Sequence, residues 1–271
     1  MNYTIPGRRN RAMDRTSKIL GRVLVTCAVV FLLAPALFIA ILSFSNDERV
    51  SFPPKSWGLD RYVDVFTSGK WAAPTLLSLE IGAWVALASL LVALPLVFAL
   101  KRSNLPGRGL LEATAIAPLV IPISAYAVGL YAVFAQLDLL GSKFGIILAH
   151  SVHALPMVVI VLATSLDQIR PDLELSAMTM GANRLKAWTS VTIRLLTPSI
   201  IAAMLFGFIT SFDEAVFITF LGGVGLVTLP KYIFDTVQYA VDPAITAMAT
   251  ILMITTAGIM LLGSALRKDI K

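Results

Sequence analysis

Stretches without a charged residue recur along the chain, and six of them are long enough to cross a bilayer, which takes about 20 apolar residues in a helix. These uncharged runs are residues 23–46, 81–100, 113–137, 144–166, 195–212 and 243–266. We expect the second to extend back through Glu80 to about Thr75. The fifth should extend forward through Asp213 and Glu214 to about Phe220. The pattern predicts an all-α membrane protein with six transmembrane helices.

Composition and charge support the same class. The 271 residues are 57% hydrophobic and only 14% charged, whereas a soluble domain carries about 25% charged residues. The net charge of +6 does not indicate nucleic-acid binding, because the basic residues cluster beside the apolar runs, where they set membrane orientation. Sixteen of the 22 Lys and Arg residues fall on one side of the six spans. We therefore expect residues 1–19 to form a basic cytoplasmic tail and residues 20–271 a transmembrane domain with both termini cytoplasmic.

A polar, helix-forming segment, residues 172–198, separates the fourth and fifth runs on the cytoplasmic side. Its apolar residues recur at helical spacing: Leu175, Met178, Ala182, Leu185 and Trp188. Gly181 is expected to end one short helix and let the chain turn into a second. The pattern fits two interpretations, an amphipathic helix lying on the membrane surface and a helix gripped by a soluble partner.

This segment resembles the cytoplasmic signature of permease subunits in bacterial ATP-binding-cassette importers of the type I fold. That signature is Glu-Ala-Ala, three residues, Gly, and about nine residues later Ile-x-Leu-Pro. Here L-S-A at 175–177 precedes G-A at 181–182, and V-T-I-R occupies 191–194. The acid stands one position early, at Glu174, and Arg194 takes the place of the proline.

The resemblance extends over most of the chain, to the spermidine/putrescine-type permeases, a group that includes opine and phosphonate importers. The segments that carry it are SFPPKSWGLDRYVDVF (51–66), LPGRGLLEA (105–113), ILAHSVHALP (147–156), SFDEAVFITFL (211–221) and TLPKYIFDTVQYAVDPAITAMAT (228–250). It implies a multi-pass subunit of the bacterial inner membrane. Its implied partners are a second, distinct permease, two ATPase subunits and a periplasmic solute-binding protein.

By the same resemblance, a coupling helix between helices 4 and 5 would sit in a cleft of an ATPase subunit, with Leu185 and Trp188 buried there. The residues assigned to this coupling are Glu174, Ala177, Gly181, Ala182, Leu185 and Trp188. Gly222, Gly223 and Gly225 would form a re-entrant outer gate between helices 5 and 6. An ordinary flexible loop is the alternative for these three glycines.

Three acids fall inside the expected spans, where a charge costs about 2.5–3.5 kcal/mol. We assign Asp213, Glu214 and Glu80, together with Tyr126, to a substrate pathway, because an acidic lining attracts a cation such as a polyamine. In the alternative interpretation, these acids pair with Lys or Arg, or cap a broken helix. His150 and His153 share a helical face, and packing or a hydrogen bond to a neighbouring helix suits them better than metal binding.

The chain has no G-x-x-x-x-G-K-[ST] phosphate loop and no G-x-S-x-G or H-E-x-x-H motif. It is therefore expected to be non-catalytic, without metal or cofactor of its own, with ATP and Mg²⁺ on the partner ATPase. The expected function is alternating-access uptake of a small cation, above all putrescine or spermidine. Opines, other amino compounds and aminophosphonates are alternative solutes. An ion-coupled secondary transporter and a passive membrane anchor are alternatives of other classes.

Overall fold

The computed structural model describes the backbone of residues 8–239 and 242–268 and the side chains of residues 17–239 and 242–258. Within these residues every regular element is helical, apart from one antiparallel bridge between Ser45 and Trp57. The chain divides into two compact units, one made of Met1–Gly69 with Tyr239–Lys271 and the other of Lys70–Gln238. Residues 1–7 of the expected basic tail lie outside the described residues, and helix α1 begins at Arg8.

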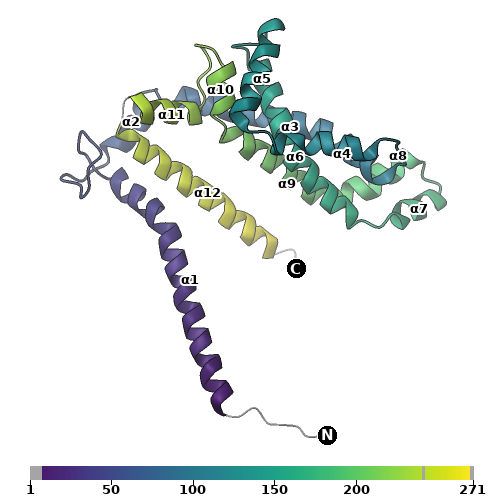
Figure 1. Cartoon of the computed structure of the whole chain (residues 1–271), viewed down its shortest axis with the longest axis horizontal. Coiled ribbons are helices and arrows are strands. Elements are labelled where there is room, and N and C mark those ends of the chain that lie inside the picture. The colour runs from purple at the N-terminus through teal and green to yellow at the C-terminus, as the bar shows by residue number, and fades with distance from the viewer. Residues whose placement is uncertain (1–7, 240–241, 269–271) are drawn as a thin grey trace. The chain divides into compact units, whose positions relative to one another are not determined.

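The first unit contains three helices, and the second contains the rest (Figure 1). The first unit is built from α1 (Arg8–Ser43), α2 (Asp60–Thr67) and α12 (Ala244–Lys268). The second holds α3 (Ala72–Arg102), α4 (Arg108–Ile116), the 3-10 turn η1 (Ala117–Leu119), α5 (Ile123–Gln136), α6 (Lys143–Asp167), α7 (Asp172–Thr179), α8 (Arg184–Ala187), the π-helical turn η2 (Trp188–Thr192), α9 (Ile193–Phe212), α10 (Val216–Leu221) and α11 (Leu229–Tyr239).

Four of the expected spans are present as continuous helices long and apolar enough to cross a membrane. They are Ser17–Ser43, Ala72–Arg102, Lys143–Asp167 and Arg184–Phe212. The sixth expected span, 243–266, corresponds to helix α12 (Ala244–Lys268). Its side chains are described only to Gly258, so the crossing of the membrane by α12 stays a prediction.

The third expected span, 113–137, is not one straight helix. Arg108–Leu119 and Ile123–Gln136 meet at an angle of 106°. Pro122 explains the break, because proline has no N–H to donate and disfavours helical backbone at the residue before it, Ile121. The run expected as one helix is therefore two helices, and its count as one membrane span stays a prediction.

The fifth expected span also ends earlier than predicted. Helix α9 stops at Phe212, and α10 begins as a separate helix at Val216. The acids Asp213 and Glu214 thus lie in the break between two helices and not within one continuous helix. The reason is a side-chain cap, described with the site below.

In the first unit, the buried Arg61 of α2 ties the end of α1 to α12. Its guanidinium donates to the carbonyl of Leu42 at 2.6 Å and to Thr246 Oγ1 at 3.1 Å. A cation at the last carbonyls of a helix is favoured by the helix dipole.

Asp47 orders the loop that follows α1. Its carboxylate accepts from the backbone N–H of Lys55 at 2.9 Å, and also from the hydroxyl and the N–H of Ser56. The Lys55 N–H, followed by the Ser56 hydroxyl, holds the pKa of Asp47 well below its usual range. The carboxylate therefore stays charged at neutral pH, and this ordering is lost only as the pH falls below the usual carboxyl range.

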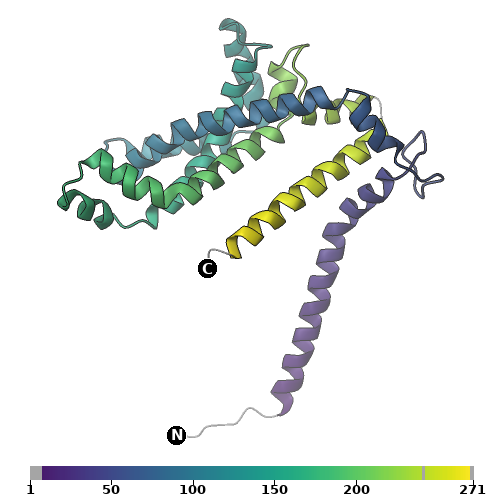
Figure 2. The same cartoon turned by 180° about the vertical axis from the view of Figure 1, so that it is seen from behind.

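In the second unit, α3, α6 and α9 lie side by side (Figure 2). Small residues let these helices approach closely, as is usual in membranes. A Cβ at Gly82 of α3 would lie 2.8 Å from the ring of Phe208. A Cβ at Gly207 of α9 would lie 3.0 Å from Ser89 Oγ and 3.3 Å from a methyl group of Val158. A cluster of buried apolar side chains from α3, α6 and α9 packs between these three helices.

Gly207→Leu is expected to lower the thermal stability of the purified protein, since a large side chain in a packed core costs about 1–3 kcal/mol. Thermal unfolding followed by tryptophan fluorescence measures the change. Gly109→Leu is the matched control, because nothing lies within 4 Å of a Cβ at Gly109. Equal unfolding temperatures for the two variants would contradict close packing at Gly207.

Candidate functional site

The segment at residues 172–198 forms two short helices joined by a tight glycine turn. Gly181 has φ +94°, a left-handed conformation that favours glycine. Its N–H donates to Met178 O at 3.0 Å, and the N–H of Ala182 donates to Ala177 O at 3.1 Å. These two bonds make the Schellman motif that ends α7. The predicted helix break at Gly181 is confirmed.

Helix α8 begins at a side-chain cap directly after this turn. Asn183 Oδ1 accepts from the backbone N–H of Lys186 at 2.8 Å, which satisfies one of the free N–H groups of the helix start. The chain then passes through the π-helical turn η2 into α9. Such π turns are rare and occur frequently at functional sites.

Glu174 of α7 connects this segment to two other elements. Its Oε1 accepts from Thr192 Oγ1 of η2 at 2.7 Å and from Arg102 Nε of α3 at 3.3 Å. The side chains of Arg102 and Glu174 are only 11% and 14% exposed, and Thr192 is fully buried. Glu174 therefore links α7, at the start of the segment, to η2 and also to the C-terminal end of α3.

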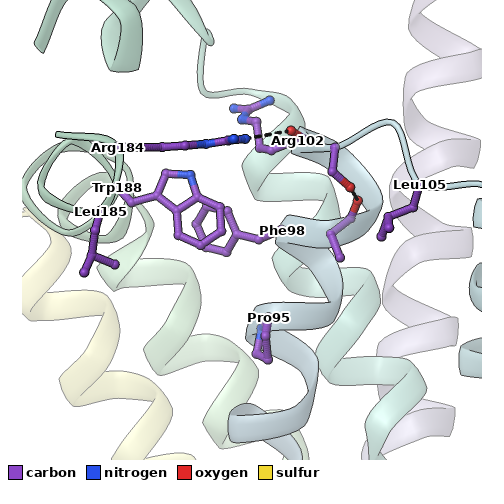
Figure 3. Close-up of a pocket in the computed structure, with 9 residues that line it drawn as sticks. Pro95, Phe98, Arg102, Leu105, Arg184, Leu185 and Trp188 are labelled. Carbon is purple, nitrogen blue, oxygen red and sulfur yellow. Dashed lines mark hydrogen bonds between the residues drawn. The ribbon is translucent and has the colours of Figure 1, made fainter. Parts of the chain in front are cut away.

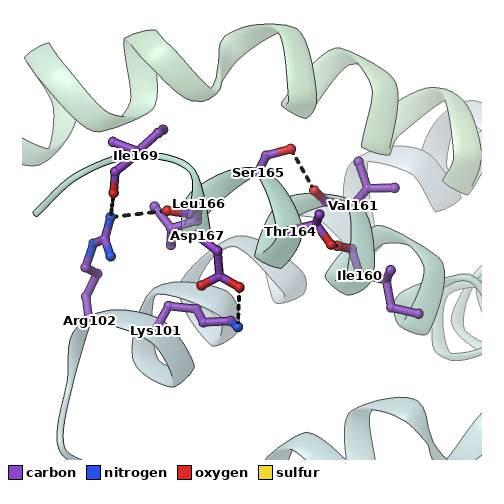
Figure 4. Close-up of polar contacts among 9 residues, drawn as sticks. All are labelled: Lys101, Arg102, Ile160, Val161, Thr164, Ser165, Leu166, Asp167 and Ile169. Atoms are coloured by element: carbon purple, nitrogen blue, oxygen red, sulfur yellow. Dashed lines mark hydrogen bonds and ion pairs between the residues drawn. The ribbon is translucent and has the colours of Figure 1, made fainter. Parts of the chain in front are cut away.

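Arg102 also caps the end of α6 (Figure 4). Its Nη2 donates to Ile169 O at 2.6 Å and to Leu166 O at 3.3 Å. The neighbouring Lys101 pairs with Asp167 at 2.6 Å. Sequence reasoning did not single out Arg102 as a site residue. The position of Arg102 directly after the apolar run 81–100 was the available sequence signal, because a basic residue at the end of a membrane helix can pair with an acid of a connecting segment such as Glu174.

The apolar residues of this segment divide between exposed and packed positions. Leu175, Met180 and Leu185 are 60%, 82% and 69% exposed, whereas Ala177 is buried. Trp188 is half-buried, and its ring packs at a tilt of 40° against Phe98 of α3, with a centroid distance of 3.8 Å. The indole predicted to enter an ATPase cleft is thus packed within its own chain. Ala182 is half-buried beside the turn.

At the start of α7, Asp172 pairs with Arg170. The hydrogen bond from the Arg170 guanidinium lowers the pKa of Asp172. Both side chains are mostly exposed, so this pair contributes little to stability.

The three acids expected inside the spans have three different environments. Glu80 of α3 pairs with Lys143 of α6, with Oε2 to Nζ at 2.7 Å, and both side chains are about half-exposed. Glu214 is 8% exposed, and its Oε1 accepts from the backbone N–H groups of Val216 and Phe217. Asp213 is exposed, and among the described residues its carboxylate has no hydrogen-bond or ion-pair partner.

Pairing and helix capping, the alternatives considered for these acids, are therefore the observed contacts of Glu80 and Glu214. The Glu214 carboxylate supplies acceptors for the free N–H groups at the start of α10, which is why α9 ends and a new helix begins. Asp213 alone of the three keeps a carboxylate open to a ligand.

Helix α10 and the glycines after it pack against the turn between α5 and α6. Gly141 N–H donates to Leu221 O at 2.8 Å. A Cβ at Gly222 would lie 2.5 Å from Ile218 O, and Gly223 has φ +60° with Gly141 close by. Nothing lies within 4 Å of a Cβ at Gly225. Gly222 and Gly223 thus form a fixed turn, and a gating role for the three glycines stays a prediction.

Phe217 of α10 is fully buried at the centre of an aromatic cluster that sequence reasoning did not identify. Tyr126 of α5 lies edge-on to it at 5.5 Å, and His150 and His153 of α6 lie at 5.8 and 5.4 Å. His150 Nδ1 shares a 2.9 Å hydrogen bond with Ser211 Oγ of α9. The predicted hydrogen bond from this histidine to a neighbouring helix is confirmed.

Known proteins match this chain in sequence and in fold. The putrescine transport system permease protein PotI of Escherichia coli is 29% identical over 238 residues, 85% of this chain and 84% of PotI. The sulfoquinovosyl glycerol transport system permease protein SmoH of Agrobacterium fabrum is 29% identical over 73% of this chain and 72% of SmoH. A bacterial transporter that imports the acidic polysaccharide alginate has the same fold, with a TM-score of 0.72, 16% identity, and coverage of 97% of this chain and 99% of that one.

The family described as binding-protein-dependent transport system inner membrane components matches residues 91–268, which include the segment 172–198, the Asp213 break and the glycine turn. The chain therefore belongs to this family and is a membrane permease subunit of an ATP-binding-cassette importer.

Proposed function

We propose that this subunit imports a polyamine such as putrescine, and that Asp213 is its contact with the cationic solute. The observation that carries the proposal is the unpaired carboxylate of Asp213 at the break between α9 and α10. An uncompensated acid at membrane depth is costly and marks a solute path. The similarity to a putrescine permease supports the same solute class.

The proposed complex joins this chain to a second permease, two ATPase subunits and a periplasmic binding protein in the inner membrane, with both termini cytoplasmic. In alternating access, ATP binding closes the ATPases, and α7 and α8 transmit that movement. The apolar side chains offered to the ATPase are the exposed Leu175, Met178 and Met180, whereas Leu185 lines an apolar groove beside α3. An amphipathic helix bound in a groove presents its apolar face in this way.

Asp213→Asn is expected to reduce the uptake of labelled putrescine by about tenfold, equivalent to about 1.4 kcal/mol, while complex assembly stays intact. Uptake into proteoliposomes that contain the whole complex measures it. Glu112→Gln, an exposed acid of α4, is the control and should transport normally. Unchanged kinetics for Asp213→Asn would remove the cation contact.

The same assay separates the alternative solutes and the alternative energy source. Competition by an opine, an aminophosphonate or a sulfoquinovosyl glycerol, with none by putrescine, would assign the subunit to that solute instead. Uptake that requires ATP and persists after ionophore treatment identifies the ATP-driven class. Uptake abolished by the ionophore would identify an ion-coupled transporter.

A further inference from the structure

An apolar groove of about 560 Å³ lies between the end of α3 and helix α8 (Figure 3). Pro95, Phe98 and Leu105 line one side of this α3–α8 groove, and Leu185 and Trp188 line the other. The tilted rings of Phe98 and Trp188 are in contact and join the two sides of the groove. The groove is thus a preformed apolar surface and does not depend on side chains that must first rearrange.

Two guanidinium groups stand at one edge of the groove. Arg184 lies along the edge and donates from Nη2 to the carbonyl of Arg102 at 3.5 Å. The Arg102 side chain is held in place by Glu174 and by two carbonyls of the α6 end. Arg184 is exposed and has no carboxylate partner among the described residues. The edge therefore carries an uncompensated positive charge beside an apolar surface.

The groove is charged at one edge and apolar along the rest of its length, which suits an amphiphilic ligand. Leu185 points along α3 toward Pro95, away from the edge where Arg102 and Arg184 lie (Figure 3). Lys101 and Arg102 follow directly after an apolar run, which is the position of basic residues at the cytoplasmic headgroup level. The charged edge thus lies at headgroup depth and the apolar part extends toward the hydrocarbon. Basic pockets of this kind at the cytoplasmic side bind anionic lipid headgroups.

We propose that the α3–α8 groove binds an anionic phospholipid of the cytoplasmic leaflet. Its phosphate lies at Arg184 and Arg102, and one acyl chain runs along Phe98 and Leu185. The lipid is thereby in contact with Trp188, the first residue of η2, where the coupling segment enters α9. This site is independent of the solute, so it stands or falls separately from the role of Asp213.

Trp188 makes the site measurable by fluorescence in the intact complex. The complex is placed in nanodiscs that contain equal fractions of either brominated phosphatidylglycerol or brominated phosphatidylcholine, both of which quench nearby tryptophans. We expect stronger quenching by the anionic lipid in the wild type, with the contribution of Trp188 about twofold larger than in phosphatidylcholine. This excess should vanish in Trp188→Phe, which removes the reporter, and in Arg184→Gln, which removes the headgroup contact.

Two variants test whether charge at position 184 is the cause. Lys186→Gln removes an exposed basic residue of the same helix outside the groove and should keep the excess. Arg184→Lys should restore part of it. Equal quenching by the two lipids, or an excess that survives Arg184→Gln, would overturn the proposal. If Trp188→Phe left the quenching by both lipids unchanged, Trp188 would not be in contact with lipid; a protein partner would then fill the groove, and the proposal would also be overturned.

Lipid retained through purification provides a second measurement that does not depend on the tryptophan substitution. Native mass spectrometry of the complex should show one fewer bound phosphatidylglycerol per copy of this chain in Arg184→Gln than in the wild type. The Lys186→Gln complex should retain the wild-type number. An unchanged number in Arg184→Gln would refute the site.

Discussion

Glu174→Ala is expected to reduce solute uptake by at least tenfold and to lower the thermal stability of the complex. The change leaves Arg102, whose side chain is 11% exposed, without its carboxylate, and the buried Thr192 hydroxyl without its acceptor. Breaking a buried ion pair costs about 3–5 kcal/mol. This contact joins α7 to η2 and α3, so in the proposed mechanism its loss weakens the transmission of ATPase movement to the membrane helices. Uptake and ATP hydrolysis are measured on the same preparation, and hydrolysis should persist.

Asp172→Ala is the matched control, since Asp172 lies on the same helix and also pairs with an arginine, but in an exposed position. Exposed pairs contribute about 0–1 kcal/mol, so this variant should behave like the wild type. The double variant Arg102→Ala with Glu174→Ala should cost less than the sum of the single variants, because the two residues share one contact. Wild-type uptake and stability in Glu174→Ala would refute the fastening role.

Glu214→Ala is expected to reduce uptake by more than tenfold, whereas Glu214→Gln should stay within about threefold of the wild type. Alanine leaves two N–H groups at the start of α10 without an acceptor, and the loss of a helix cap costs about 0.5–2 kcal/mol. Glutamine keeps a carbonyl oxygen at the same place but removes the charge. The two substitutions therefore separate a capping role from a role in attracting a cation.

The measurement is putrescine uptake at several concentrations, with the amount of assembled complex checked for each variant. Asp213→Asn serves as the comparison, because there the removal of charge alone is expected to be harmful. If Glu214→Gln lost as much uptake as Glu214→Ala, the charge of Glu214 would be what matters, and the capping explanation would fail.

Local signals in the chain were sufficient for most of the elements. The long uncharged runs predicted α1, α3, α6 and α9, because a membrane helix must be apolar along its whole length. Gly181 predicted the turn between α7 and α8, because few other residues adopt a positive φ readily. The family resemblance rested on short motifs in order, and the match over residues 91–268 confirmed the broader family of importer permeases.

Hydropathy did not reveal the breaks within the apolar runs. The run at 113–137 contains Pro122, and its hydropathy is the same whether the helix is straight or bent by 106°. The break after Phe212 depends on Glu214 accepting from the backbone ahead of it. Both are matters of backbone hydrogen bonding, which a count of apolar residues does not contain.

Composition and local backbone preference were enough to predict the class of protein, four of its spans and the helix–turn–helix segment around Gly181. The tertiary structure alone decided which acid remains free, because pairing depends on what another helix brings near. Glu80 meets Lys143, 63 residues away, and Glu174 meets Arg102, 72 residues away. The packing of α3 against η2 likewise places the ring of Trp188 against Phe98. Contacts between residues so distant along the chain are set by helix packing, which no local pattern records.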